Sequence, residues 1–336
     1  NNFKKIGLSA LAGSLVMTSV NAVEYSMTGN AKIEFASQDY PQGAESLNGK
    51  GIGVNSDLTL SASGELDNGY TVSFTQVFDT DGALSNTSSQ VAIGMGSLGS
   101  LHFNNKFGAK ANGIDDVMPA AYNETWDGMA LTTDNPSFFG SSTASGSVDY
   151  RIPAMDFAGA TINASVTLDS AADVGPATAG SIATSSTNGE AYTIQVAHES
   201  GLELGGGWEK IENGTSASTG SDEKNATAYV KFAMGPLSVG YQEAYQNSAN
   251  GAEDNSAEFM GIAYTAGDLS VSYGESQLAN EGIGGSTVVE RQLDSVQAAY
   301  TMGAMTISGA LSETSNAGGT AGNTYEESRI SVAFAF

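Results

Sequence analysis

From residue 24 to the end of the chain, large apolar side chains alternate with small or polar ones in short segments. In the final segment, RISVAFAF, every second residue from Ile330 to Phe336 is large and apolar, and the residues between them are Ser or Ala. A period of two is typical of β-strands, because successive side chains point to opposite faces of a sheet. No segment after the first two dozen residues shows the 3.6-residue period of an amphipathic helix. The pattern therefore predicts a β-protein.

The connections between the predicted strands alternate between two lengths. Three-residue turns, such as 199–201 and 266–268, alternate with long polar loops, such as 170–188 and 279–289. This arrangement is typical of an up-and-down meander that has one smooth end and one elaborated end. We predict sixteen strands, at 24–36, 51–64, 70–79, 89–96, 99–106, 144–152, 160–169, 189–199, 202–212, 223–234, 236–246, 256–266, 268–278, 290–302, 304–314 and 325–336.

The kinds of side chain on the two faces of these strands distinguish a membrane protein from a soluble one. One face carries Val, Ile, Leu and Phe, with Tyr near strand ends, and the other carries Ser, Thr, Asn, Gln or charged residues. An apolar exterior, a polar interior and aromatic rims are typical of transmembrane β-barrels, whose closure also satisfies the backbone in hydrocarbon. We predict an all-β fold, a 16-stranded antiparallel transmembrane β-barrel with short periplasmic turns and long external loops. A secreted β-sandwich or β-helix is the alternative.

The first 22 residues have the features of a secretory signal peptide. Lys4 and Lys5 form a basic start, an apolar stretch covers 6–17, and small residues precede a predicted cleavage site after Ala22. The stretch is too short to span a bilayer. The barrel is then formed by 23–336, and removing two of the 12 basic residues changes the formal net charge from −25 to −27.

Composition excludes several kinds of site and partner. The chain contains no Cys, which excludes disulfides and thiolate metal ligands. Its negative charge disfavours nucleic acid as a partner, because phosphate binding requires clustered Lys and Arg. His102 and His198 are on separate predicted strands, and no catalytic set of residues stands out. We therefore predict no enzymatic activity and no cofactor, although acids at 79–82 and 115–116 could bind Ca²⁺ through oxygen ligands instead of being merely solvated.

One connection, at 107–143, breaks the regular pattern. A loop of this length in a compact fold is usually functional. The lumen of a sixteen-stranded barrel is wide enough for water, and a long third loop can fold inward and narrow it. The segment contains several carboxylates and aromatic residues, among them Asp116, Tyr122, Glu124 and Trp126.

Short motifs around this loop resemble those of the general bacterial outer-membrane porins, in particular the alphaproteobacterial type. They are GSLGSLHFNNKFG before the loop, DVMP within it, DYRIP after it, and the terminal Phe336. The resemblance covers the mature chain in architecture but only these motifs in residues. It implies a pore in the outer membrane of a Gram-negative bacterium that lets small hydrophilic solutes and ions diffuse passively. It also implies a homotrimer, joined through strands at both chain ends, in contact with outer-membrane lipid and lipopolysaccharide.

The resemblance further implies a constriction between acids on the loop and bases on the barrel wall. Asp116 matches an acidic position of the family and Glu124 a later one, whereas Ala120 replaces the family's glutamate and Asp115 could compensate. The expected acidic side is Asp115, Asp116, Glu124 and Asp127, and the expected basic wall is Lys32, Lys106 and Arg151. Lys231, Arg291 and Arg329 also point inward by alternation, where they would screen other carboxylates. The alternative is that these charges are simply solvated.

Three functions remain open at this point: a passive pore, a substrate-selective channel, and a structural or adhesive surface protein. A row of aromatic side chains in the lumen would favour the selective channel, but only Tyr229 and Phe259 are scattered there. The excess of acids over bases, on the loop and in the whole chain, predicts a pore that prefers cations.

Overall fold

The structure is a computed structural model that describes residues 23–41, 48–81, 84–106, 108–126, 136, 138–140, 146–170, 188–212, 222–248, 254–281 and 289–336. The predicted signal peptide, Asp127 and much of the second half of the long loop lie outside these residues. None of the helical turns in the described part of the chain is long and apolar enough to cross a membrane.

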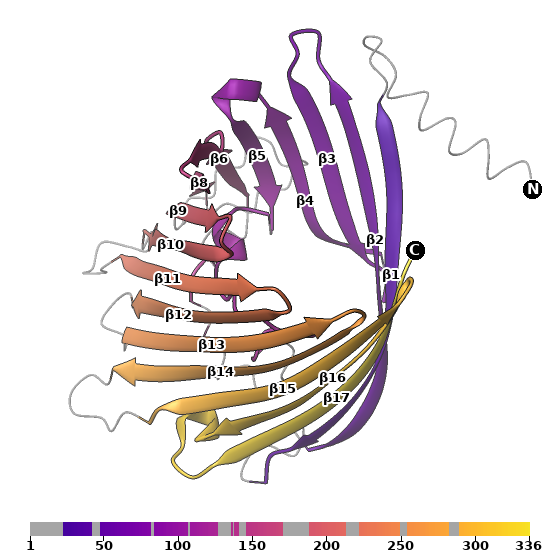
Figure 1. The fold of residues 1–336 in the computed structure, drawn as a ribbon, viewed down its shortest axis with the longest axis vertical. Helices are drawn as coiled ribbons and strands as arrows, with labels where there is room; N and C mark the ends of the chain where they lie inside the picture. Colours follow the sequence, from indigo (N-terminus) through magenta and orange to yellow (C-terminus); the bar gives the residue numbers. More distant parts are fainter. Residues whose placement is uncertain are drawn as a thin grey trace, which may run out of the picture.

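The described residues form one antiparallel sheet that closes on itself, because β1 pairs with β17 on one side and with β2 on the other. The strands are β1 (Glu24–Asp39), β2 (Gly49–Glu65), β3 (Thr71–Asp79), β4 (Ser85–Gly94), β5 (Ser100–Asn105), β6 (Ser147–Arg151), β7 (Met155–Phe157), β8 (Ala160–Ser170), β9 (Asn188–His198), β10 (Leu202–Ile211), β11 (Glu223–Met234), β12 (Leu237–Asn247), β13 (Asp254–Ala266), β14 (Leu269–Glu281), β15 (Arg291–Met302), β16 (Met305–Ser315) and β17 (Thr324–Ala335). Figure 1 shows the wall curving from β1 around to β17, with the C-terminus beside β1.

The barrel has sixteen strands around its wall in the described residues, as predicted. The short β6 and β7 both pair with β8, so they are two pieces of one strand, interrupted around Pro153. Proline has no N–H to donate to a neighbouring strand, which explains an interruption that the predicted strand 144–152 did not include.

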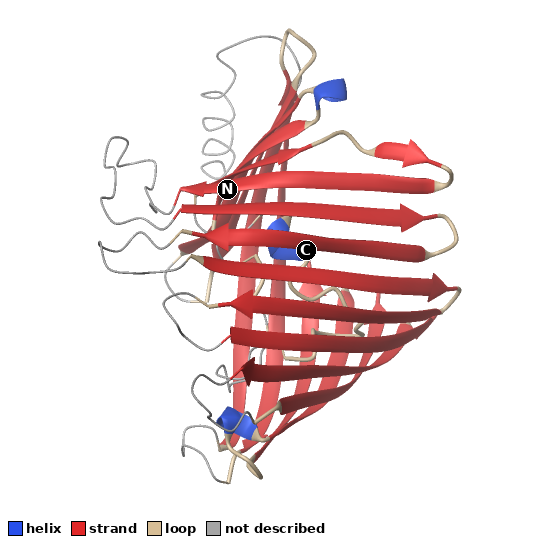
Figure 2. Ribbon diagram, turned by 90° about the vertical axis from the view of Figure 1, so that its left-hand side faces the viewer, coloured by secondary structure: helices blue, strands red, loops and turns tan. Residues whose placement is uncertain are grey.

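Tight turns join the strands at one end of the barrel (Figure 2). Three of them place Gly235, Gly267 and Gly303 at φ of +59°, +60° and +59°. A positive φ at the first central residue is what a two-residue type II′ hairpin requires, and glycine adopts it without steric cost. These turns fix the register of β11 to β16.

The outer surface is apolar and the inner surface is polar, which confirms the predicted orientation of the strands. Exposed side chains on the outer face include Ile52, Phe74, Ile262, Leu311 and Ile330. Buried side chains on the inner face include Thr167, Gln242, Ser276, Ser295 and Ser331. This is the reverse of a soluble sandwich, in which the large apolar side chains are buried.

The first and last strands form the seam of the barrel. Ten residue pairs, from Asn30 opposite Ala335 to Asp39 opposite Glu326, align β1 with β17. The terminal residue continues this pairing, because the N–H of Phe336 donates to the carbonyl of Gly29 at 2.8 Å and the N–H of Gly29 donates back at 3.1 Å. The chain therefore uses its final residue to complete the wall.

Candidate functional site: the loop inside the lumen

The third loop, which connects β5 to β6, lies inside the barrel against the inner faces of β9 to β15. Its first fixed point is Gln242 of β12, whose side chain is fully buried. The Gln242 amide Nε2 donates to the carbonyls of Ile114 and Asp115 at 2.9 and 3.0 Å, and its Oε1 accepts from the N–H of Val117 at 3.0 Å. One neutral side chain thus satisfies three backbone groups of the loop.

A second glutamine, Gln297 of β15, holds the loop three strands further along the wall. Its Oε1 accepts from the N–H groups of Tyr122 and Asn123 at 2.9 and 3.0 Å, and its Nε2 donates to the carbonyl of Asn123 at 2.8 Å. Between the two glutamines, the N–H of Ala121 donates to Oγ of Ser272 on β14 at 2.8 Å. The loop backbone therefore follows the wall from β12 to β15.

Glycines on the wall create the space for this segment. A Cβ at Gly240 would lie 2.9 Å from the side chains of Met118 and Pro119, and one at Gly261 would lie 2.9 Å from the carbonyl of Pro119. A Cβ at Gly274 would overlap Oγ1 of Thr125. Real Cβ contacts are not this short, so glycine at these positions lets the loop lie against the three strands without a shift of either.

Apolar side chains of the loop form a small core with the inner wall. Phe138 packs with Ala244, Ala257, Phe259 and Leu278, which come from β12, β13 and β14. Closer to β9, the loop residues Ile114 and Phe139 pack with Ala191 and Tyr229. Burial of this apolar surface adds to the hydrogen bonds that hold the loop in place.

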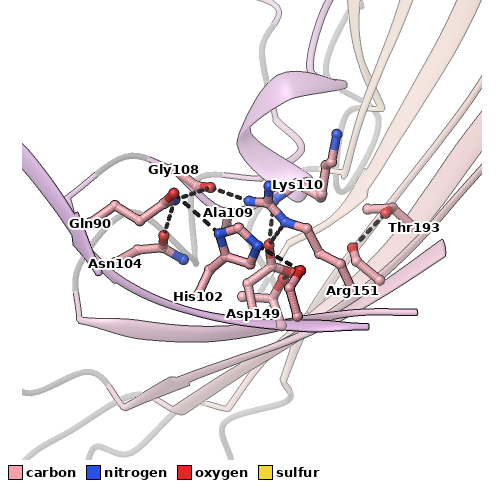
Figure 3. Close-up of polar contacts among 12 residues, drawn as sticks. Gln90, His102, Asn104, Gly108, Ala109, Lys110, Asp149, Arg151 and Thr193 are labelled. Carbon is pink, nitrogen blue, oxygen red and sulfur yellow. Dashed lines mark hydrogen bonds and ion pairs between the residues drawn. The ribbon is translucent and has the colours of Figure 1, made fainter. Parts of the chain in front are cut away.

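The base of the loop is fixed at Asp149 and Arg151 of β6 (Figure 3). The fully buried Asp149 accepts from Nε of Arg151 at 2.7 Å, from Oγ1 of Thr167 at 3.0 Å and from the N–H of Lys110 at 3.2 Å. Nη2 of Arg151 donates to the carbonyl of Gly108 at 2.8 Å. The ion pair thus orients the arginine toward the start of the loop.

At the tip of the loop, Tyr122 reaches the seam of the barrel. Its hydroxyl donates to Oε2 of Glu34 on β1 at 2.7 Å. The same carboxylate lies 3.1 Å from Nζ of Lys32 and 3.2 Å from Nη1 of Arg329 on β17. The loop is therefore fastened at its base, along its middle and at its tip.

A closed polar-lined barrel with a long loop fastened inside it is the architecture of an outer-membrane pore. Residues 7–336 match the model of the family described as Gram-negative porin. The chain belongs to the Gram-negative porins. It lies in the outer membrane, and its barrel forms a channel across that membrane.

Solved structures show that this porin shares the fold of known ones. The trimer form of OmpT from Vibrio cholerae is 11% identical, with a TM-score of 0.65 over 94% of this chain and 100% of the other. A porin refined at 1.8 Å resolution is 16% identical, with a TM-score of 0.64 over 93% and 100%. A mutant of the porin of Rh. blastica is 14% identical, with a TM-score of 0.59 over 93% and 100%. No curated protein matches the sequence, and the alphaproteobacterial type remains a prediction.

The predicted acids of the porin occupy different environments. Asp115 is half-buried, with its carbonyl held by Gln242. Asp116, expected on the acidic side of the constriction, is only 6% exposed. Glu124 lines a small cavity between the loop and the wall. Asp127 lies outside the described residues, so its place in the constriction remains a prediction.

Burial changes the acidity of Asp116. Desolvation raises the pKa of this carboxyl from 3.8 to about 6, because the charged form loses its hydration. The N–H of Met118, which donates to Oδ1 at 2.8 Å, only partly offsets this effect, and neighbouring Asp115 adds to it. Asp116 thus titrates near neutral pH inside the loop.

The predicted bases are not gathered into one basic wall. Lys32 and Arg151 are on the inner face, where their carboxylate partners are Glu34 at 3.1 Å and Asp149 at 2.7 Å. Lys106 does not join them, because β5 ends before it and its backbone turns to φ +68°. Its exposed side chain donates to the carbonyl of Asn86 at 2.6 Å.

The other predicted inward bases also contact polar neighbours. Lys231 lies 3.2 Å from Glu203, Arg329 pairs with Glu34 and Glu327, and Arg291 donates to Asn280. Among the residues that the structure describes, no three His, Asp or Glu side chains gather as metal ligands would. Binding of Ca²⁺ remains a prediction.

Sequence reasoning missed the residues that position the loop, chiefly Gln242, Gln297, Tyr122, Glu34 and Asp149. Alternation along the strands places four of them on the inner face. The alternation contains no signal that a loop more than a hundred positions away will contact Gln242 and Gln297. The backbone hydrogen bonds that they satisfy become visible only in three dimensions.

Proposed function

We propose that this porin lets small hydrophilic solutes and ions diffuse passively and that it prefers cations. The observation that carries the preference is the pairing of the lumen bases. Lys32, Arg151, Lys231 and Arg329 each form an ion pair with a carboxylate, so their attraction for anions is largely cancelled. Acids such as Asp115 on the loop then set the sign of the field in the lumen.

The alternative of a channel that selects one nutrient through lumen aromatics has less support. Tyr229 and Phe259, the aromatic residues expected in the lumen, are only 5% and 0% exposed beneath the third loop. Side chains covered in this way cannot stack with a passing solute. A passive pore needs no such contacts, and no catalytic role is proposed.

A planar bilayer tests the proposed preference. With purified protein in a KCl gradient, we expect a zero-current potential of the sign that cations produce. Asp115→Asn should move this potential toward zero, because the variant removes one carboxylate from the loop. Glu65→Gln is the matched control, because Glu65 is the last residue of β2 and the third loop lies against β9 to β15. This variant should move the zero-current potential less. A wild-type pore that selects anions would contradict the proposal.

We also propose a homotrimer in contact with outer-membrane lipid and lipopolysaccharide. The support is the trimer form of OmpT, which shares the fold, and the exposed apolar outer faces of strands near both chain ends. On these faces Ile52 and Phe74 are 76% and 38% exposed in the single chain, and Phe336 is 77% exposed. Sedimentation in mild detergent should give three times the mass of the mature chain, and a stable monomer would contradict this assignment.

A further inference from the structure

Tyr122 spans the sector of the lumen in front of β16 and β17. Its backbone is held to β15 by Gln297, and its hydroxyl donates to Glu34 on β1. In the sheet, β16 and β17 are the two strands between β15 and β1. The Tyr122 side chain therefore connects two parts of the wall and covers the strands between them.

Little space remains behind this connection. A cavity of about 10 Å³ lies between loop residues 122–125 and the wall, lined there by Gln297, Glu327 and Arg329 among others. This volume is about that of one water molecule. A hydrated ion does not fit into this cavity.

The sector in front of β16 and β17 is rich in charge. Glu327 is 5% exposed and lies 2.5 Å from Nη2 of Arg329, which also pairs with Glu34. Glu124 of the loop lines the same cavity. With Lys32 included, three carboxylates accompany two bases. Opening the sector would therefore expose these carboxylates to passing ions.

We infer that Tyr122, through its hydrogen bond to Glu34, seals this sector of the lumen and so determines both the width and the charge selectivity of the open path. This inference rests on the proposed function, because it concerns how ions pass through the pore. It gives Tyr122 a role that the predicted acid–base constriction did not include.

Single-channel recordings of the full-length protein test the seal. Tyr122→Ala should raise conductance by roughly 1.5-fold, because the open cross-section becomes wider. It should also shift the zero-current potential further toward cations, because Glu124 and Glu327 become accessible. Tyr122→Phe, which removes only the hydroxyl, should show brief excursions to the same higher level.

Tyr241 provides the matched control. Its hydroxyl makes a bond of the same kind, to Glu243 at 2.7 Å, but on the outer face of β12. Tyr241→Phe and Tyr241→Ala should conduct like the wild type. If Tyr122→Ala does not assemble, the comparison of Tyr122→Phe with Tyr241→Phe decides the question.

The outcomes of these recordings distinguish a failure of the proposed seal from a failure of the proposed pore function. A wild type that conducts, with Tyr122 variants that behave like their Tyr241 counterparts, would overturn the seal and leave the proposed function intact. Lower conductance in Tyr122→Ala would also overturn the seal, because it would mean that Tyr122 keeps the loop out of the open path. A wild type without ion conductance would instead remove the proposed function.

Discussion

The middle of the third loop and its tip are attached to the barrel in different ways. In the middle, the neutral Gln242 binds backbone groups of Ile114, Asp115 and Val117. At the tip, one side-chain hydroxyl binds one half-buried carboxylate, Glu34, that also has two ionic partners. The hydrogen bonds of Gln242 join neutral groups and so depend little on salt, whereas the contact at the tip involves a charged carboxylate and depends on one loop side chain. The structure thus combines a fixed segment with one that a single side chain controls.

Removing the clamp in the middle should have the largest effect. Gln242→Ala leaves the N–H of Val117 and the carbonyls of Ile114 and Asp115 without their buried partner. We expect the loop to lose roughly 3 kcal/mol of docking free energy, since each unsatisfied buried group is costly. Hydrogen exchange at the Ala121 amide, which donates to Ser272 and not to Gln242, measures this loss.

Gln195→Ala is the control for this experiment, because Gln195 is also an inward glutamine but donates to the hydroxyl of Tyr229 rather than to the loop backbone. Equal exchange at Ala121 in the two variants would mean that Gln242 does not hold the loop.

The buried carboxyl of Asp116 should make the docking of the middle segment depend on pH. Its pKa is about 6 in the folded protein against 3.8 ordinarily, so the folded state binds the proton more tightly. Docking should therefore weaken as the pH rises from about 4 to 6 and then stay constant, by on the order of 2–3 kcal/mol in total.

Asp116→Asn should abolish this pH dependence, because an amide does not titrate. Protease cleavage of the loop, followed from pH 4 to pH 7, measures docking in both proteins. A wild-type profile as flat as that of the variant would show that Asp116 has an ordinary pKa.

We expect the smallest effect from adding a methyl group where the loop packs against the wall. In Gly261→Ala the new Cβ would lie 2.9 Å from the carbonyl of Pro119. The loop should shift at a cost of about 1–2 kcal/mol, as for modest overpacking. Gly53→Ala adds the same methyl group to the inner face of β2, where no atom lies within 4 Å. A melting temperature lowered equally in both variants would point to strand propensity rather than to contact with the loop.

The strands were predictable because alternation is a local property of the chain. Lys32 and Arg151 were placed on the inner face for the same reason, and the structure confirms that orientation. Lys106 was wrongly placed on a strand, because β5 ends one residue earlier, at Asn105. The backbone at Lys106 has a positive φ, which alternation cannot reveal. The burial of Asp116 was also unpredictable, because a loop has no period from which to read the direction of its side chains.

The partners of the loop depend on the closure of the whole barrel. Tyr122 and Glu34 are 88 positions apart, and Val117 and Gln242 are 125 apart. Each pair forms only because the wall brings distant strands around a common lumen. The interruption of the sixth strand near Pro153, by contrast, had a visible signal in the proline itself.

The seam between β1 and β17 also determines the order in which this protein can fold. The partner of the first strand is the last one, and its pairing ends at Phe336, the final residue. Until β17 pairs with it, β1 keeps an unpaired edge that could bind strands of other chains. Contacts of such long sequence separation form slowly. We therefore expect closure of this seam to be slow, and factors that guard the free edges of the open sheet would act before it.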